Sequence, residues 1–221
     1  MKGILLINKS SGFSTNEILV KIKEKLKIKI GFSGTLDPLA EGLILFLLGN
    51  STKLSDYFFF LPKTYFVIVK VNYSTITDDI FGKKNSIDLI KKIKEKKKKF
   101  FLSIINKKFQ IPHKFSSNKI KNIRNFKKSR KNKKFKIKSK KIYIDYFEIK
   151  KKRKKKFKIK IKCKTGTYIR SLIRDINFIF KINLTVICLK RISIGKYKIK
   201  NSILFLNKIN KNFIIKNLIK W

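Results

Sequence analysis

Acidic side chains are scarce in this sequence. Twelve Asp and Glu residues stand against 58 Lys and Arg residues in 221, a formal net charge of +46. A field of this sign repels cations and basic proteins and attracts polyanions. Nucleic acid is the leading partner class, because neutralising phosphates releases counterions whatever the base sequence. A membrane surface is the weaker interpretation, since no basic amphipathic helix stands apart from the globular pattern.

Alanine is almost absent and occurs only at Ala40, while Lys, Ile, Asn and Phe dominate. AT-rich codons produce this bias, so mutational drift on solvated faces is an alternative explanation for much of the lysine excess. The charge therefore supports RNA binding only in part.

Cysteine and long apolar runs are also rare. Cys163 and Cys188 are far apart and have neither metal-ligand spacing nor a disulfide framework, which indicates small buried thiols. No apolar run is long enough to span a bilayer, and the first ten residues do not resemble a signal peptide. We expect a cytoplasmic monomer.

Apolar patterning predicts an α+β fold with a large mixed or antiparallel sheet flanked by helices and loops. Ser14 and Glu17 have capping-box spacing and predict the start of a helix. Strict alternation over residues 157–164 predicts a strand with one face in the core and one in water. The other expected strands are residues 3–7, 43–48, 65–71, 143–149 and 184–189. The other expected helices span 86–99, follow Thr167, and follow Thr52 with Leu54, Tyr57, Phe58 and Leu61 on one side.

The length of 221 residues, with 43% hydrophobic residues, suits a single domain that buries a real core. Residues 113–140 are polar and Lys-rich, and two interpretations stay open for them. One is an RNA-facing insertion, and the other is a solvated low-complexity loop.

Asp37 lies in the stretch with the strongest chemical signal, residues 31–42, which has three glycines and one proline. This composition predicts a tightly specified loop. An aspartate fixed in such a loop can act as a nucleophile or base, or it can simply form an Asx-turn within its own loop. The residues alone favour the turn by about two to one.

Eight landmarks occur in one order along the chain, and together they resemble the TruB family of pseudouridine synthases. They are K-S-S-G-F-S-T at 9–15, G-F-S-G-T-L-D-P-L-A-E-G at 31–42, G-N-S-T-K at 49–53, K-T-Y at 63–65, T-I-T-D-D-I-F-G at 75–82, Q-I-P at 110–112, G-T-Y-I-R at 166–170 and L-K-R at 189–191.

The resemblance implies that Asp37 attacks a tRNA uridine covalently and that Arg170 is its ion-pair partner. It implies that Tyr65 stacks on the base and assists catalysis, and that Tyr168 and Leu189 line the base pocket. The expected reaction is isomerisation of uridine 55 in the TΨC loop, without a metal or organic cofactor. Without the resemblance, the sequence alone would indicate a surface cation at Arg170 and core residues at Tyr65 and Leu189.

Three departures from the family pattern affect these expectations. Phe32 replaces the family's loop histidine; an aromatic ring still stacks on RNA but cannot hydrogen-bond as imidazole does. The family's C-terminal PUA domain has no counterpart in residues 201–221, so we expect one catalytic domain over 1–221. His113, the single histidine, occupies a family proline position and is expected at the surface.

Overall fold

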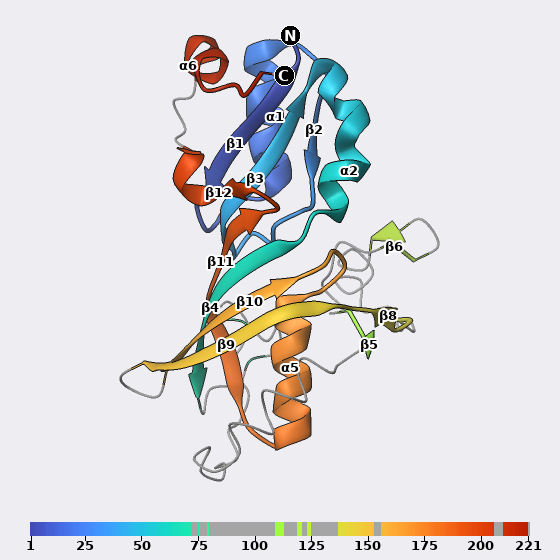
Figure 1. Ribbon diagram of the computed structural model, residues 1–221, viewed down its shortest axis with the longest axis vertical. Coiled ribbons are helices and arrows are strands. Elements are labelled where there is room, and N and C mark those ends of the chain that lie inside the picture. The colour runs from blue at the N-terminus through green and yellow to red at the C-terminus, as the bar shows by residue number, and fades with distance from the viewer. Residues whose placement is uncertain are drawn as a thin grey trace. The chain divides into compact units, whose positions relative to one another are not determined.

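The structure, a computed structural model, describes residues 1–71, 75, 79, 109–112, 119–120, 123–124, 137–152, 156–205 and 210–220. The chain divides into two compact units, Met1–Phe66 with Cys188–Trp221, and Val67–Ile187. It passes from one unit to the other within β4 (Lys63–Val71) and returns within β11 (Leu184–Ile194) (Figure 1). The predicted helix over 86–99, His113 and most of the predicted insertion at 113–140 lie outside the described residues.

The first unit is built on a mixed sheet ordered β13-β1-β3-β11, in which β2 also pairs with β3 and β12 with β11. The pairs β1/β3 and β2/β3 are antiparallel, whereas β1/β13 and β11/β3 are parallel. The predicted α+β class with a mixed sheet is therefore confirmed. Besides part of β4 and β11, the elements of the first unit are β1 (Gly3–Lys9), α1 (Thr15–Leu26), β2 (Ile30–Ser33), β3 (Glu41–Leu48), η1 (Gly49–Leu54), α2 (Ser55–Phe60), β12 (Tyr197–Lys198), η3 (Ile199–Asn201), β13 (Ile203–Leu204) and α6 (Lys211–Lys216).

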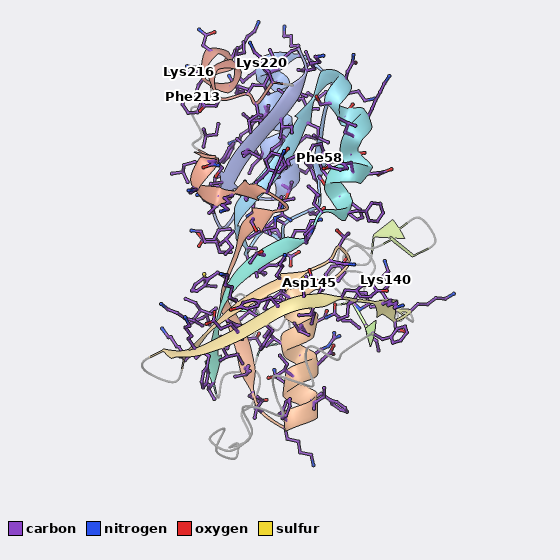
Figure 2. All side chains as sticks on the ribbon, viewed as in Figure 1. Phe58, Lys140, Asp145, Phe213, Lys216 and Lys220 are labelled. Atoms are coloured by element: carbon purple, nitrogen blue, oxygen red, sulfur yellow. The ribbon has the colours of Figure 1, made fainter. Side chains whose placement is uncertain are left out.

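Strand β3 is the centre of this unit, because residues 42–48 are all buried. Burial at both odd and even positions means that both faces of the strand are covered, as the continuous apolar run predicts. On one face, Phe58 of α2 packs with Leu45 and Ile194 and is fully buried (Figure 2). The prediction for the helix after Thr52 was wrong in part. Leu54 and Tyr57, expected on the same side as Phe58, are exposed, and α2 buries only Phe58.

Helix α1 begins as the capping-box spacing predicts. The Glu17 amide donates to Ser14 Oγ, and the Glu17 carboxylate accepts from the Ser14 amide. These two bonds satisfy amides that the first turn of a helix leaves without partners. The helix then buries Ile18, Ile22 and Leu26. The cap therefore fixes the point at which residues 9–14 end and α1 begins, at Thr15.

The second unit contains the hairpin of β9 (Ile144–Lys152) and β10 (Lys156–Cys163) together with α5 (Ile169–Phe180). The predicted alternation of β10 is confirmed, with Ile159, Ile161 and Cys163 buried and the intervening lysines exposed. The helix buries the apolar stripe of Ile169, Leu172, Ile173 and Ile176. The short strands are β5 (Phe109–Gln110), β6 (Lys119–Ile120), β7 (Ile123–Arg124) and β8 (Lys140–Lys141).

The two cysteines differ in burial. Cys163 is buried as expected, but Cys188 is half-buried. Within the described part of the chain, no helix is both long and apolar enough to cross a membrane.

Gly42 allows β11 to approach β3 closely, where it pairs with Arg191 at a φ of +110°. A Cβ here would lie 2.3 Å from the Arg191 carbonyl oxygen, whereas a Cβ at Gly12 (φ +97°) would meet nothing within 4 Å. We expect Gly12→Ala to lower the free energy of unfolding by about 1 kcal/mol through backbone strain alone. Gly42→Ala should cost about 1–3 kcal/mol more, because β11 must move. Equal losses for the two variants in urea unfolding would contradict the close approach.

Candidate active site

Asp37 lies in the loop of residues 34–40, which joins β2 to β3. The loop is shorter than the predicted stretch of 31–42, because residues 31–33 belong to β2 and residues 41–42 to β3. The Ala40 amide donates to the Asp37 carbonyl at 3.0 Å, which closes a tight turn with Pro38 at its second position. Leu36 and Ala40 on either side are buried, while Asp37 is half-buried. The turn thus holds the aspartate backbone between two anchored neighbours.

Thr15, the first residue of α1, anchors the loop before Asp37. Its hydroxyl accepts from the Leu36 amide and donates to the Leu36 carbonyl, both at 3.1 Å. The threonine side chain is 1% exposed, so water does not replace these bonds. The N-terminus of α1, fixed by its capping box, therefore positions the residue next to Asp37.

Lys9, at the end of β1, holds the loop after Asp37. The residue is completely buried, and its ammonium donates to the carbonyls of Ser10 at 2.9 Å, Phe13 at 2.7 Å and Pro38 at 3.0 Å. Three carbonyls match the three donors of an ammonium group. A buried charge without such partners would cost several kcal/mol, so this bonding makes burial of the cation tolerable.

The ionisation of Lys9 reflects this environment. Burial lowers its pKa from 10.5 to about 8, while attraction to Asp37 and Glu41 opposes the shift. The nearby guanidinium of Arg191 adds to the lowering. The Lys9 ammonium and the Asp37 carboxylate therefore interact electrostatically within the first unit.

Arg191 of β11 is a second buried cation, with 1% of its surface exposed. Its Nε donates to the Leu43 carbonyl at 2.7 Å and its Nη2 to the Gly34 carbonyl at 3.1 Å. Leu43 and Gly34 lie on opposite sides of Asp37 in the chain, so one planar guanidinium ties the two flanks together.

The turn at residues 10–12 adds two bonds to the loop. The Ser11 hydroxyl donates to the Leu39 carbonyl at 2.8 Å, and the Gly12 amide donates to the Pro38 carbonyl at 2.9 Å. The positioning roles of Lys9, Thr15 and Arg191 were missed from the sequence, although all three belong to the quoted landmarks. In a chain with 58 basic residues, composition does not distinguish a buried cation from an exposed one.

In the second unit, Gln110 fixes the backbone that leads into α5. Its side-chain carbonyl accepts from the Tyr168 amide at 2.9 Å, and its side-chain amide donates to the Tyr168 carbonyl at 3.1 Å. Tyr168 is the N-cap of α5 and is half-buried. Gln110 is 2% exposed, so the two bonds are protected from water.

Arg170 is buried and forms an ion pair with Asp79, with 2.9 Å between Nη1 and Oδ2. The interpretation of Arg170 as a surface cation is therefore wrong. The Thr75 hydroxyl donates to the Asp79 carbonyl at 2.6 Å, and Asp79 forms a parallel bridge with Val186. Asp79 is thus held through its main chain, and its carboxylate orients the arginine.

The predicted site residues are distributed over both units. Phe32, Asp37, Tyr65 and Leu189 belong to the first unit, and Tyr168 and Arg170 belong to the second. Phe32 stacks edge-on against Phe46 with 6.0 Å between ring centroids, Tyr65 is half-buried in β4, and Leu189 is buried in β11. The predicted ion pair of Arg170 with Asp37 stays a prediction. Across the described ranges, no cluster of His, Cys, Asp and Glu is arranged to hold a metal ion.

Comparison with known proteins gives a consistent picture. The model of the TruB family pseudouridylate synthase (N terminal domain) matches residues 20–169. The chain is 35% identical over 215 residues to tRNA pseudouridine synthase B of Mesoplasma florum, which covers 96% of this chain and 75% of that relative. It is 33% identical over 219 residues to tRNA pseudouridine synthase B of Endomicrobium trichonymphae, which covers 98% of this chain and 95% of that relative.

Among solved structures, the fold is similar to one chain in the crystal structure of a Cbf5-Nop10-Gar1 complex. The TM-score is 0.66 at 19% identity, over 92% of this chain and 52% of that chain. This chain thus spans about half of the matched one. At this level of identity the likeness concerns the fold alone.

Replacing Thr15 tests the anchor of the loop. Thr15→Val keeps the shape but leaves the buried amide and carbonyl of Leu36 without partners, so we expect a loss of about 2 kcal/mol in the free energy of unfolding. Thr15→Ser keeps the hydroxyl and should lose clearly less. Equal losses for Val and Ser in urea denaturation would show that the hydroxyl does not anchor Leu36.

The buried ammonium can be followed by NMR of lysine side chains. One lysine should titrate near pH 8, and its signal should be missing in Lys9→Arg. Between about pH 8 and 10.5 the unfolded chain retains a proton that the folded chain releases, so Lys9 makes the free energy of unfolding rise with pH in this window. Below pH 8 both states hold the proton and the contribution is constant. A spectrum in which every lysine titrates near 10.5 would contradict the buried position.

Proposed function

The chain belongs to the TruB family of pseudouridylate synthases, and we propose that it isomerises uridine to pseudouridine in tRNA with Asp37 as nucleophile. The observation that carries the proposal is the loop around Asp37. Two buried cations and one buried threonine fix its backbone, while the aspartate itself stays half-buried. A structural Asx-turn needs no such network, whereas a nucleophile must be held in line with its target.

The reaction is an isomerisation, so atoms and electrons balance without a co-reactant. The Asp37 carboxylate attacks the target nucleotide, at the ribose or at the base, and the bond between the ribose C1′ and the uracil N1 breaks. The uracil turns within the pocket and C5 bonds to C1′, while the bond between the Asp37 carboxylate and the nucleotide breaks and frees the carboxylate. The proton on C5 is then lost as N1 gains one. The proposal therefore includes no metal or organic cofactor.

The target base must leave its stack before it can reach Asp37, and protein contacts must replace the lost stacking. We assign this role to the ring of Tyr65, which also assists removal of the C5 proton. Tyr168 and Leu189 line the pocket, and Phe32 stacks on RNA where the family has histidine. The ordered backbone at Tyr168 supports its part in this assignment.

Arg170 supplies the positive charge that the proposed mechanism needs beside Asp37. Its ion pair with Asp79 supports this role, because a guanidinium that is paired with a buried carboxylate has a fixed orientation. A surface arginine would lose side-chain entropy on each encounter with substrate, whereas this one is ordered beforehand.

The proposed target is uridine 55 in the TΨC stem-loop, bound by a monomer. The sequence Thr35-Leu36-Asp37-Pro38 supports this choice, since sister families usually have R-L-D in this loop. Recognition of the stem-loop rests mainly on shape and phosphates, and the flipped base is read inside the pocket.

An assay with unmodified tRNA transcript tests the proposal. Asp37→Asn keeps the shape of the side chain but removes the nucleophile, so the rate of isomerisation should fall at least about 1000-fold while tRNA affinity stays within about twofold. Asp56→Asn, at an exposed position of α2, removes the same charge and should retain full activity. Mapping of the product should place pseudouridine at position 55.

Two outcomes would overturn the proposal. Wild-type protein that binds tRNA tightly without forming pseudouridine would be an RNA-binding protein rather than an enzyme. Pseudouridine at another uridine, or in ribosomal RNA alone, would refute the assignment of the target.

A further inference from the structure

The β9–β10 hairpin of the second unit has one buried face and one basic face. In the register of the hairpin, Lys158 pairs with Lys150, Lys160 with Glu148 and Lys162 with Tyr146. The intervening residues Ile159 and Ile161 are buried. We call this side of the hairpin the lysine face; it consists of Tyr146, Glu148, Lys150, Lys158, Lys160 and Lys162.

Exposed aromatic rings lie among these lysines. Tyr146 is 43% exposed, with the Lys160 ammonium 5.8 Å from its ring centroid. Next to the hairpin, Tyr143 is 44% exposed and has Lys141 at 5.3 Å and Lys164 at 5.0 Å from its ring centroid. Exposed rings flanked by cations are the combination that binds RNA, because bases stack on the rings while lysines contact phosphates.

The charge of the hairpin is far from balanced. Between residues 140 and 164 the acidic side chains are Asp145 and Glu148, and Asp145 is labelled on β9 in Figure 2. Glu148 pairs with Lys150 at 3.1 Å. The Cα atoms of Lys158, Lys160 and Lys162 follow one another at about 6.7 Å, twice the rise per residue of a strand. Their like charges on the same face of the strand repel each other. A polyanion laid along β10 would remove this repulsion.

We propose that the lysine face binds the phosphate backbone of the RNA substrate. This inference rests on the proposed function, because it assigns a second contact to the same tRNA. A membrane surface fits less well, since the face has no row of apolar side chains to enter the lipid. An acidic protein would lack the unstacked bases that suit the exposed rings of Tyr143 and Tyr146.

Drift in base composition offers the competing explanation for these lysines, and it makes a different prediction. Under drift, the exposed lysines of the hairpin are equivalent to those at other solvated positions, such as Lys23, Lys25 and Lys29 in the first unit. A binding face requires that position matters as well as charge. Two triple variants with the same change in charge separate the two explanations.

The test compares Lys158→Gln/Lys160→Gln/Lys162→Gln with Lys23→Gln/Lys25→Gln/Lys29→Gln. Each triple lowers the formal net charge from +46 to +43. The dissociation constant for unmodified tRNA transcript is measured over a series of salt concentrations, with thermal melts to confirm folding. Each lost phosphate contact reduces the slope of log K against log salt by about 0.7–0.9.

The hairpin triple should lose about 2–3 units of this slope and bind tRNA on the order of 100-fold more weakly at 0.15 M salt. The control triple should stay within about threefold of wild type, and Lys158→Arg/Lys160→Arg/Lys162→Arg should bind normally, because the positive charge is kept. At saturating tRNA the hairpin triple should keep the wild-type turnover rate, since none of its residues belongs to the proposed catalytic set.

Equal weakening in the two glutamine triples would overturn the proposal in favour of general charge. An unchanged slope in a folded hairpin triple would overturn it directly. These binding results are independent of catalysis: a wild-type protein that forms no pseudouridine would refute the proposed function, while the salt series would still decide whether the lysine face binds RNA.

Discussion

The buried ammonium of Lys9 is the interaction on which the candidate site depends. It bonds to carbonyls from the turn after β1 and to the carbonyl of Pro38, next to Asp37. The cost of burying the charge is met only while these carbonyls stay in place, so the cation and the loop stabilise each other. The Arg191 guanidinium does the same for the two flanks of the loop. The chain thus uses buried cations to order the backbone, while Asp37 itself is half-buried.

Buried and exposed cations serve different purposes in this protein. Lys9 and Arg191 are buried and bind carbonyls of their own unit, whereas Arg170 is buried and pairs with Asp79. The hairpin lysines are exposed, and their charge is directed at solvent and at whatever polyanion approaches. A high net charge therefore does not describe one property: a few cations organise the site, and the exposed ones set affinity and its dependence on salt.

Local signals in the sequence predicted much of the fold. The Ser14–Glu17 spacing predicted the start of α1, and the alternation in β10 predicted its buried face, because both depend on residues close in sequence. Leu54 and Tyr57 were misplaced, because residues 49–54 form the 3-10 helix η1 and only residues 55–60 form α2, so the spacing of one continuous α-helix does not apply. The clamp around Asp37 was not predicted. It joins residues 9–15, 34–43 and 191, and only the folded chain brings these together. The family resemblance indicated that these segments matter but gave no contact for Lys9.

Hydrogen exchange of single amides tests the clamp most directly, in wild type and in Lys9→Met, which keeps the length of the side chain without its charge. The clamp predicts that the amides of Gly12 and Ala40, bonded to Pro38 and Asp37 in the wild type, exchange at least about tenfold faster in the variant. The amides of β3 should keep their protection, which would show that the change is local. Unchanged exchange at Gly12 and Ala40 in a folded variant would mean that the buried ammonium does not hold the Asp37 loop.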